Sequence, residues 1–110
     1  MIIEISSGFA ARMRDPEDFR RFHVELDVDK AALPELRVRL GDLADWVDAE
    51  VAWIAVAALR LLALRLLPGV TADPTWEHGL ATMIENARPH GWIREQPHPA
   101  IRAHLVWKKE

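Results

Sequence analysis

Histidine and tryptophan side chains are concentrated in the last third of the chain. Four of the five histidines and three of the five tryptophans lie there: Trp76, His78, His90, Trp92, His98, His104 and Trp107. An imidazole beside a carboxylate can act as a general base near neutral pH. Neighbours on a helix point about 100° apart, so Glu85 suits His78 or His90 better than Glu77 suits His78. The candidate catalytic residues are therefore His78, Glu85, His90 and His98, although no nucleophile motif such as GxSxG accompanies them.

The same segment also has the residue types of a small-molecule pocket. Tryptophan and histidine combine apolar area with one polar group, which is typical of side chains that line such pockets. Trp92 follows a glycine, and His98 lies between two prolines. We therefore predict Trp92, His98 and Trp76 as ligand-binding residues. The alternative is that the tryptophans anchor the core, which fits Trp107 best because it ends a regularly alternating strand.

A metal ion, a cofactor and nucleic acid are not predicted. The histidine spacing matches no compact metal site, and the chain has no cysteine. The alternating face of His23, Glu25 and Asp27 contains oxygen ligands for a divalent cation. Side chains two apart on a strand lie roughly 6.6 Å apart, however, so a solvated sheet face is the preferred interpretation. The net charge is −3, and the helix predicted over 74–87 has no lysine or arginine, which argues against a nucleic-acid interface.

The longest apolar stretch, from Asp42 to Leu67, is predicted to be one central helix over about residues 43–67. Gly41 and Asp42 are typical of a helix start, and Pro68 with Gly69 is typical of a helix end. The apolar run within this stretch is shorter than the roughly 20 largely uncharged residues of a membrane span, and it contains two arginines, which are costly in a bilayer. We expect Arg60 and Arg65 to pair with carboxylates from the acidic first half of the chain.

The apolar surface of this helix is broader than one stripe. Such a helix must be covered on most sides, and a chain of 110 residues has few elements to do so. The sequence therefore predicts a homodimer whose interface includes Trp53, Ala57, Leu61 and Leu64.

Alternating residues predict strands at 2–5, 9–14, 22–28, 92–94 and 100–107, the first two forming a hairpin. Asp15-Pro16 predicts a short helix over about Pro16–Arg21, and Asp73-Pro74 predicts an amphipathic helix over about 74–87. Residues 30–40 fit a helix or a strand, and we favour the helix. Residues 108–110 are expected to form a frayed tail. The predicted class is α+β, with an antiparallel sheet of about four strands from both chain ends packed on the two long helices.

These features predict one domain spanning residues 1–110 in a small bacterial, cytoplasmic protein. The leading hypothesis is a self-associating binding or accessory module. The alternative is a small enzyme or small-molecule binder that uses the histidine- and tryptophan-rich last third of the chain. Neither hypothesis identifies a substrate or ligand.

Overall fold

The computed structural model describes residues 1–108, so Lys109 and Glu110 of the expected frayed tail lie outside the described residues. Within this part, the helices are α1 (Leu33–Arg39), α2 (Val56–Leu66) and α3 (Pro74–Ala87), and short 3₁₀ turns occupy Lys30–Ala32, Val70–Ala72 and Arg88–His90. The strands are β1 (Ile2–Ile5), β2 (Ala11–Arg14), β3 (His23–Leu26), β4 (Ala44–Trp46), β5 (Val51–Ala55), β6 (Ile93–Arg94) and β7 (Ala100–Trp107).

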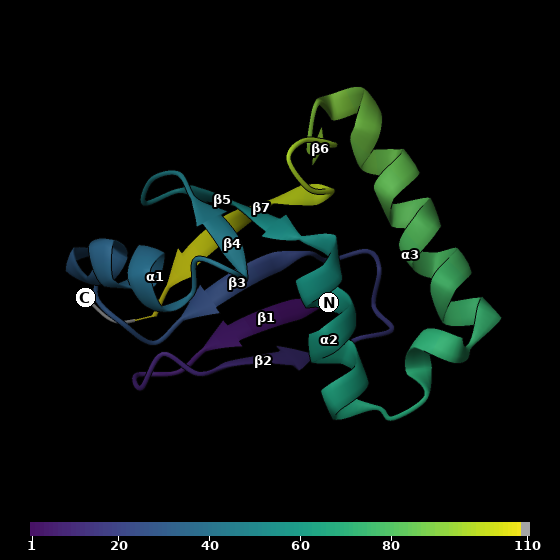
Figure 1. The fold of residues 1–110 in the computed structure, drawn as a ribbon, viewed down its shortest axis with the longest axis horizontal. Helices are drawn as coiled ribbons and strands as arrows, with labels where there is room; N and C mark the ends of the chain where they lie inside the picture. The colour runs from purple at the N-terminus through teal and green to yellow at the C-terminus, as the bar shows by residue number, and fades with distance from the viewer. Residues whose placement is uncertain (109–110) are drawn as a thin grey trace.

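The strands of the described chain form one mixed, seven-stranded sheet (Figure 1). The order is β2-β1-β3-β7-β5-β4, and β6 pairs with the start of β7. The β1–β3 and β3–β7 pairs are parallel, and the other pairs are antiparallel. The α+β class is confirmed, but the prediction of an antiparallel sheet of about four strands is wrong. Apolar alternation identifies a strand and its buried face without identifying the strands beside it.

The link from β2 to β3, residues 15–22, is a crossover loop and not the predicted short helix. Asp15 has a φ of 52°, in the left-handed region, so the chain turns sharply where β2 ends. A helix N-cap needs extended backbone, which this conformation excludes. The loop then passes the beginning of β1, where the amino group of Met1 donates hydrogen bonds to the carbonyls of Asp18 and Arg21. The crossover places β3 parallel to β1 on the side away from β2.

The predicted central helix over 43–67 is wrong in its first half. The chain forms the β4–β5 hairpin there, and α2 begins only at Val56. The carboxylate of Asp48 accepts hydrogen bonds from the backbone N–H groups of Glu50 (2.7 Å) and Val51 (3.0 Å), which closes the turn between the strands. The two strands bury alternate residues, including Trp46 and Ile54. The broad apolar surface therefore belongs to a hairpin followed by an 11-residue helix.

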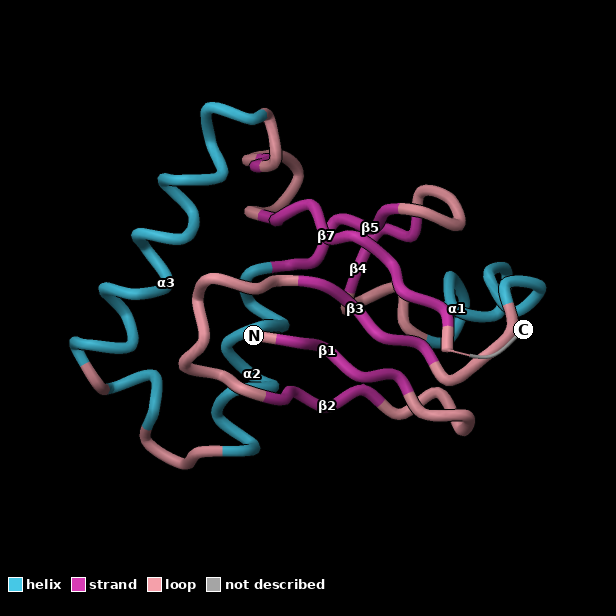
Figure 2. Tube along the Cα trace, turned by 180° about the vertical axis from the view of Figure 1, so that it is seen from behind, coloured by secondary structure: helices cyan, strands magenta, loops and turns pink. Residues whose placement is uncertain are grey.

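The core lies between the sheet and the helices that cover one of its faces. In Figure 1, α2 lies in front of β1 and β2, and in Figure 2 it lies behind them. Buried residues from the strands, such as Ile3 and Leu26, share one hydrophobic cluster with Leu59 and Leu62 of α2 and Leu36 of α1. The helical interpretation of residues 30–40 is confirmed by α1. The strands predicted at 2–5, 9–14 and 22–28 correspond to β1, β2 and β3.

The helix predicted over 74–87 is confirmed as α3. The carboxylate of Asp73 caps its first turn by accepting the N–H of Thr75 at 2.9 Å. Figure 1 shows α3 standing beside the end of the sheet and not across its face. Arg60 of α2 forms an ion pair with Glu77 of α3, which corrects the expectation that its partner comes from the first half of the chain.

The crossover loop is the main support of α3. The indole of Trp76 donates a hydrogen bond to the carbonyl of Pro16 at 2.9 Å. The ring of Phe19 lies so close to Gly79 that a Cβ there would be 2.3 Å from a ring carbon. The helix and the loop can approach this closely only because residue 79 has no side chain.

A charged network crosses the outward face of β2, β3 and β7. Glu25 accepts a hydrogen bond from Arg14 at 3.2 Å and lies 2.8 Å from the Nε2 atom of His23 and 3.7 Å from the amine of Lys108. The His23 hydrogen bond, followed by Arg14, lowers the pKa of Glu25. His23 and Glu25 lie on the sheet face that the sequence suggested for a cation. The Glu25 carboxylate there is already in contact with nitrogen donors.

We expect Glu25→Gln to lower the free energy of unfolding at pH 7 by about 1 kcal/mol, because charged hydrogen bonds are lost at a partly exposed site. The pKa of Glu25 is lower in the folded chain than the ordinary 4.5. The folded state therefore binds fewer protons, and this stabilisation is complete above pH 4.5 and lost as the pH falls through the folded pKa. Urea unfolding at pH 7 and in acid measures both effects, with exposed Glu17→Gln as the control. Equal acid sensitivity of wild type and Glu25→Gln would contradict the assignment.

Candidate functional site

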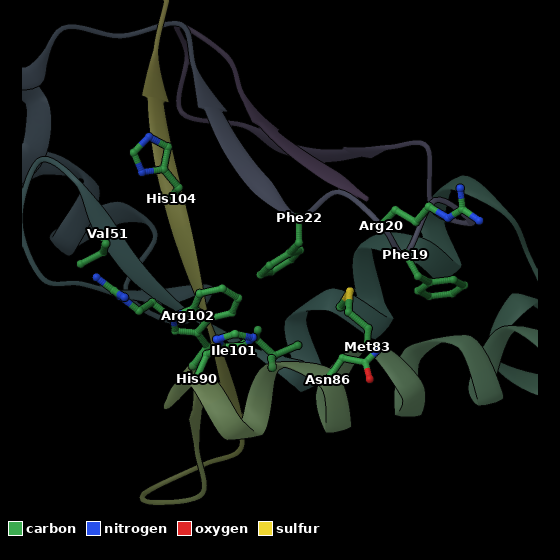
Figure 3. Close-up of a pocket in the computed structure, with 12 residues that line it drawn as sticks. Phe19, Arg20, Phe22, Val51, Met83, Asn86, His90, Ile101, Arg102 and His104 are labelled. Atoms are coloured by element: carbon green, nitrogen blue, oxygen red, sulfur yellow. The ribbon is translucent and has the colours of Figure 1, made fainter.

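An open groove lies between the C-terminal half of α3, the crossover loop and β7 (Figure 3). Its volume is about 640 Å³, within the range of small-molecule sites. We call it the α3–β7 groove. Its lining comes from four separate parts of the chain: Phe19, Arg20, Phe22, Val51, Met83, Asn86, Ala87, His90, Trp92, Ile101, Arg102 and His104.

The inner part of the groove is apolar. Met83 and Ala87 belong to the buried stripe of α3, and Ile101 belongs to the buried face of β7. Phe22 is the last residue before β3, and Figure 3 shows its ring between β7 and α3. The crossover loop therefore supplies the aromatic surface of the groove as well as the support of α3.

One wall is formed by a stacked pair, His90 and Trp92. Their ring centroids are 4.3 Å apart and their planes differ by 19°. The chain reverses at Gly91, whose φ is 74°, and the N–H of Trp92 then donates to the carbonyl of Ala87 at 3.3 Å. Arg102 of β7 donates its backbone N–H to the carbonyl of Trp92 at 2.8 Å. The hydrogen bonds fix the backbone of Trp92, and the stacking on His90 holds its indole, although 42% of the residue is exposed.

The polar groups of the groove are all neutral or cationic. Arg20, Arg102, His90, His104 and Asn86 supply them, and none of the lining residues is aspartate or glutamate. The lining also contains no serine, threonine, cysteine or lysine. The groove therefore has donors to orient a ligand, and the imidazoles of His90 and His104 are the lining groups that could act as a nucleophile or base.

The structure brings together two of the residues predicted from sequence, His90 and Trp92. His78 is exposed on α3 and does not belong to the lining of the α3–β7 groove. Glu85 pairs with Arg88 at 3.2 Å, and neither proposed histidine partner hydrogen-bonds to it among the described residues. Trp76 is 2% exposed and forms part of the core.

His98 lies at a different cavity, of about 510 Å³, beside β4 and β5. Trp53 also lines this cavity, since it lies on β5 and not on the predicted helix. The guanidinium of Arg94 lies 4.5 Å from the centre of the Trp53 ring and 2.9 Å from a carboxylate oxygen of Asp45. Trp53 is thus separated from the other predicted interface residues.

The remaining predicted interface residues, Ala57, Leu61 and Leu64, lie on the outer surface of α2. Leu61 is 56% exposed and Leu64 is 39% exposed. Positions four and seven residues apart share one face of a helix. Ala57, Leu61 and Leu64 therefore share one exposed face of α2, and the interface itself remains a prediction.

Several lining residues were missed by sequence reasoning. Phe22 was assigned only to a strand face, and Met83 only to the core stripe of its helix. Arg20, Arg102 and Phe19 carried no signal. Phe22 and Met83 line the same groove because of the path of the crossover loop. The local pattern of residues does not predict this path.

Within residues 1–108, no three histidine, cysteine, aspartate or glutamate side chains are arranged so that they could hold a metal ion. No helix in the same residues combines the length and apolar composition that crossing a bilayer requires. Comparison with known proteins finds no family model, curated protein or solved structure that matches this chain.

Proposed function

We propose that this protein is a binding module for a small organic molecule with a largely apolar body, which occupies the α3–β7 groove. The observation that carries the proposal is the juxtaposition of Phe22, Met83 and Ile101 with the exposed, rigidly held ring of Trp92. An apolar floor with a few polar groups at the rim is the usual composition of a ligand site. Binding is favoured over catalysis because no aspartate or glutamate stands among the lining residues to activate the imidazoles of His90 and His104.

A fragment screen that is monitored through the NMR signals of the methionine methyl groups tests this function. The chain has three methionines. Met83 lines the groove, whereas Met1 and Met13 lie in the core. Aromatic and alkyl fragments with acidic, neutral and basic groups should shift the Met83 methyl signal and leave the other two in place. Fragments that bind without moving the Met83 signal would contradict the proposal.

Self-association through α2 is a second, independent proposal. Leu61 and Leu64 leave an apolar surface on one face of α2, with 56% and 39% exposure. Ala57 would let a second copy of the helix approach closely. Two copies packed through this surface would remove the leucines from water without requiring any other partner.

We expect Leu61→Asp to convert the dimer into a monomer, because a carboxylate would be buried without a partner at the interface. Sedimentation over a range of protein concentrations measures the change. Val38→Asp is the matched control, since Val38 is an exposed apolar residue of α1. A wild-type chain that sediments as a monomer at high concentration, or a Leu61→Asp chain that still dimerises, would refute this proposal.

A further inference from the structure

We infer that the α3–β7 groove selects an amphipathic anion: an apolar body that carries one acidic group, placed beside Arg102. This inference rests on the proposed binding function and specifies the chemical class of the ligand. It comes from the charge of the lining, from the engagement of the arginines and from the arrangement seen in Figure 3.

The charge of the groove differs from that of the whole chain. The chain has 17 acidic and 14 basic side chains, a net charge of −3. The groove is lined by two arginines, two histidines and no carboxylate. A carboxylic acid placed there meets donors and positive charge, and no lining side chain is itself an anion, although Arg102 also helps to lower the pKa of Asp48, which lies outside the lining. An amine placed there meets no acidic partner.

The arginines of the groove also differ from most other arginines of the chain in the hydrogen bonds and ion pairs of their guanidinium groups. Eight of the eleven arginines use their guanidinium groups in hydrogen bonds or ion pairs with other described residues. Within residues 1–108, such bonds are absent for Arg20, Arg65 and Arg102. Two of these three line the groove. Their donors are therefore available to an external acceptor, and a guanidinium can bind a carboxylate or phosphate through two parallel hydrogen bonds.

The arrangement in Figure 3 places the acidic group at the β7 side. In Figure 3, Arg102, His90 and His104 are spread along the β7 side of the Phe22 ring, with the Arg102 side chain directed toward Val51, and Arg20 lies on the other side. A neutral imidazole can donate one N–H, so the β7 side offers three donor side chains. An apolar body extending from this point would lie against Phe22, Met83 and Ile101. The apolar contacts supply affinity, and the charge selects the acidic ligand.

A matched pair of probes tests whether the groove prefers an anionic ligand. 2-Naphthoate and 2-naphthamide have the same body and differ in charge. We expect the anion to bind about tenfold more tightly, a difference of about 1.4 kcal/mol, and its affinity to fall with added salt. Arg102→Gln should remove this preference, because it weakens the binding of 2-naphthoate more than that of 2-naphthamide. Arg65→Gln is the control, because this arginine lies on α2 outside the groove lining.

The outcomes separate the ligand class from the function. Equal binding of both probes, with Arg102→Gln matching wild type, would overturn the anion class and leave the groove as a binding site. Failure of both probes and of the fragment screen to move the Met83 signal would overturn the function as well. 2-Naphthyl phosphate is a third probe: tighter binding than 2-naphthoate would identify phosphate as the acidic group, and weaker binding would identify carboxylate.

Discussion

Trp76→Ala is expected to lower the free energy of unfolding by about 3–5 kcal/mol, the usual cost of removing a buried aromatic side chain. Trp76 is 2% exposed, and its indole donates a hydrogen bond to the carbonyl of Pro16. Its ring centroid lies 6.2 Å from that of Phe19. The substitution removes the main connection between α3 and the crossover loop, so a cavity and an unpaired carbonyl would both remain. Urea unfolding followed by circular dichroism measures the change.

The control for Trp76→Ala is Trp92→Ala, which removes the same side chain from an exposed position. We expect it to cost about 1 kcal/mol of stability, because the indole is 42% exposed and mainly its stacking on His90 is lost. Trp76→Phe should fall between the two, because a phenyl ring fills part of the indole site while the hydrogen bond and the remaining indole volume are lost. Equal destabilisation by Trp76→Ala and Trp92→Ala would show that α3 is not anchored through Trp76.

Phe22→Ala is expected to weaken ligand binding by at least about tenfold, because burial of a phenyl side chain is worth about 1.5–3 kcal/mol. Figure 3 places its ring between the two walls of the groove, so a ligand body must contact it. Titration with 2-naphthoate, or with the tightest fragment from the screen, measures the dissociation constant through the Met83 methyl signal.

The matched control for Phe22→Ala is Phe9→Ala. Phe9 is also half-buried, but it contacts Arg39, whose guanidinium carbon lies 5.1 Å from the ring centre, and it is not part of the groove. Unfolding curves of both variants establish that they are folded at the temperature of the titration. Equal affinities for the Phe22→Ala and wild-type chains would remove Phe22 from the site.

Much of the secondary structure could be predicted because its signals are local. The cap and proline at Asp73-Pro74 mark the start of α3, and alternation along Ile2–Ile5 and His23–Leu26 identifies two strands. The prediction of one helix over residues 43–67 was wrong, also for a local reason. Trp, Val, Ile and Ala over 44–55 fit an apolar helix as well as a buried hairpin, and only the turn at Asp48 separates the two interpretations.

The sheet order could not be predicted because it depends on the crossover loop. Asp15-Pro16 has the residue types of a helix start, but the left-handed backbone of Asp15 sends the chain past Met1 instead. The strands at 2–5 and 22–28 then become parallel neighbours. A hairpin-based prediction from the same residues produces an antiparallel sheet.

The candidate site could be predicted only where its residues are close in sequence. Both His90 and Trp92 flank the turn at Gly91, and both line the groove. His98 is six residues beyond Trp92 but belongs to the cavity at Trp53, because the loop after β6 leads away from the groove. Phe22 and Met83 are 61 positions apart in the numbered sequence. Their contact with one ligand depends on how α3 rests on the crossover loop.

The most direct test of the binding function is a measurement of intermolecular nuclear Overhauser effects from a bound ligand. The ligand would be unlabelled and the chain labelled at its methionine methyl groups and aromatic rings. We predict contacts from the ligand to the Met83 methyl group, the Phe22 ring and the Trp92 indole. Contacts to Trp53 and His98 would place the ligand in the other cavity and contradict the assignment of the α3–β7 groove as the binding site.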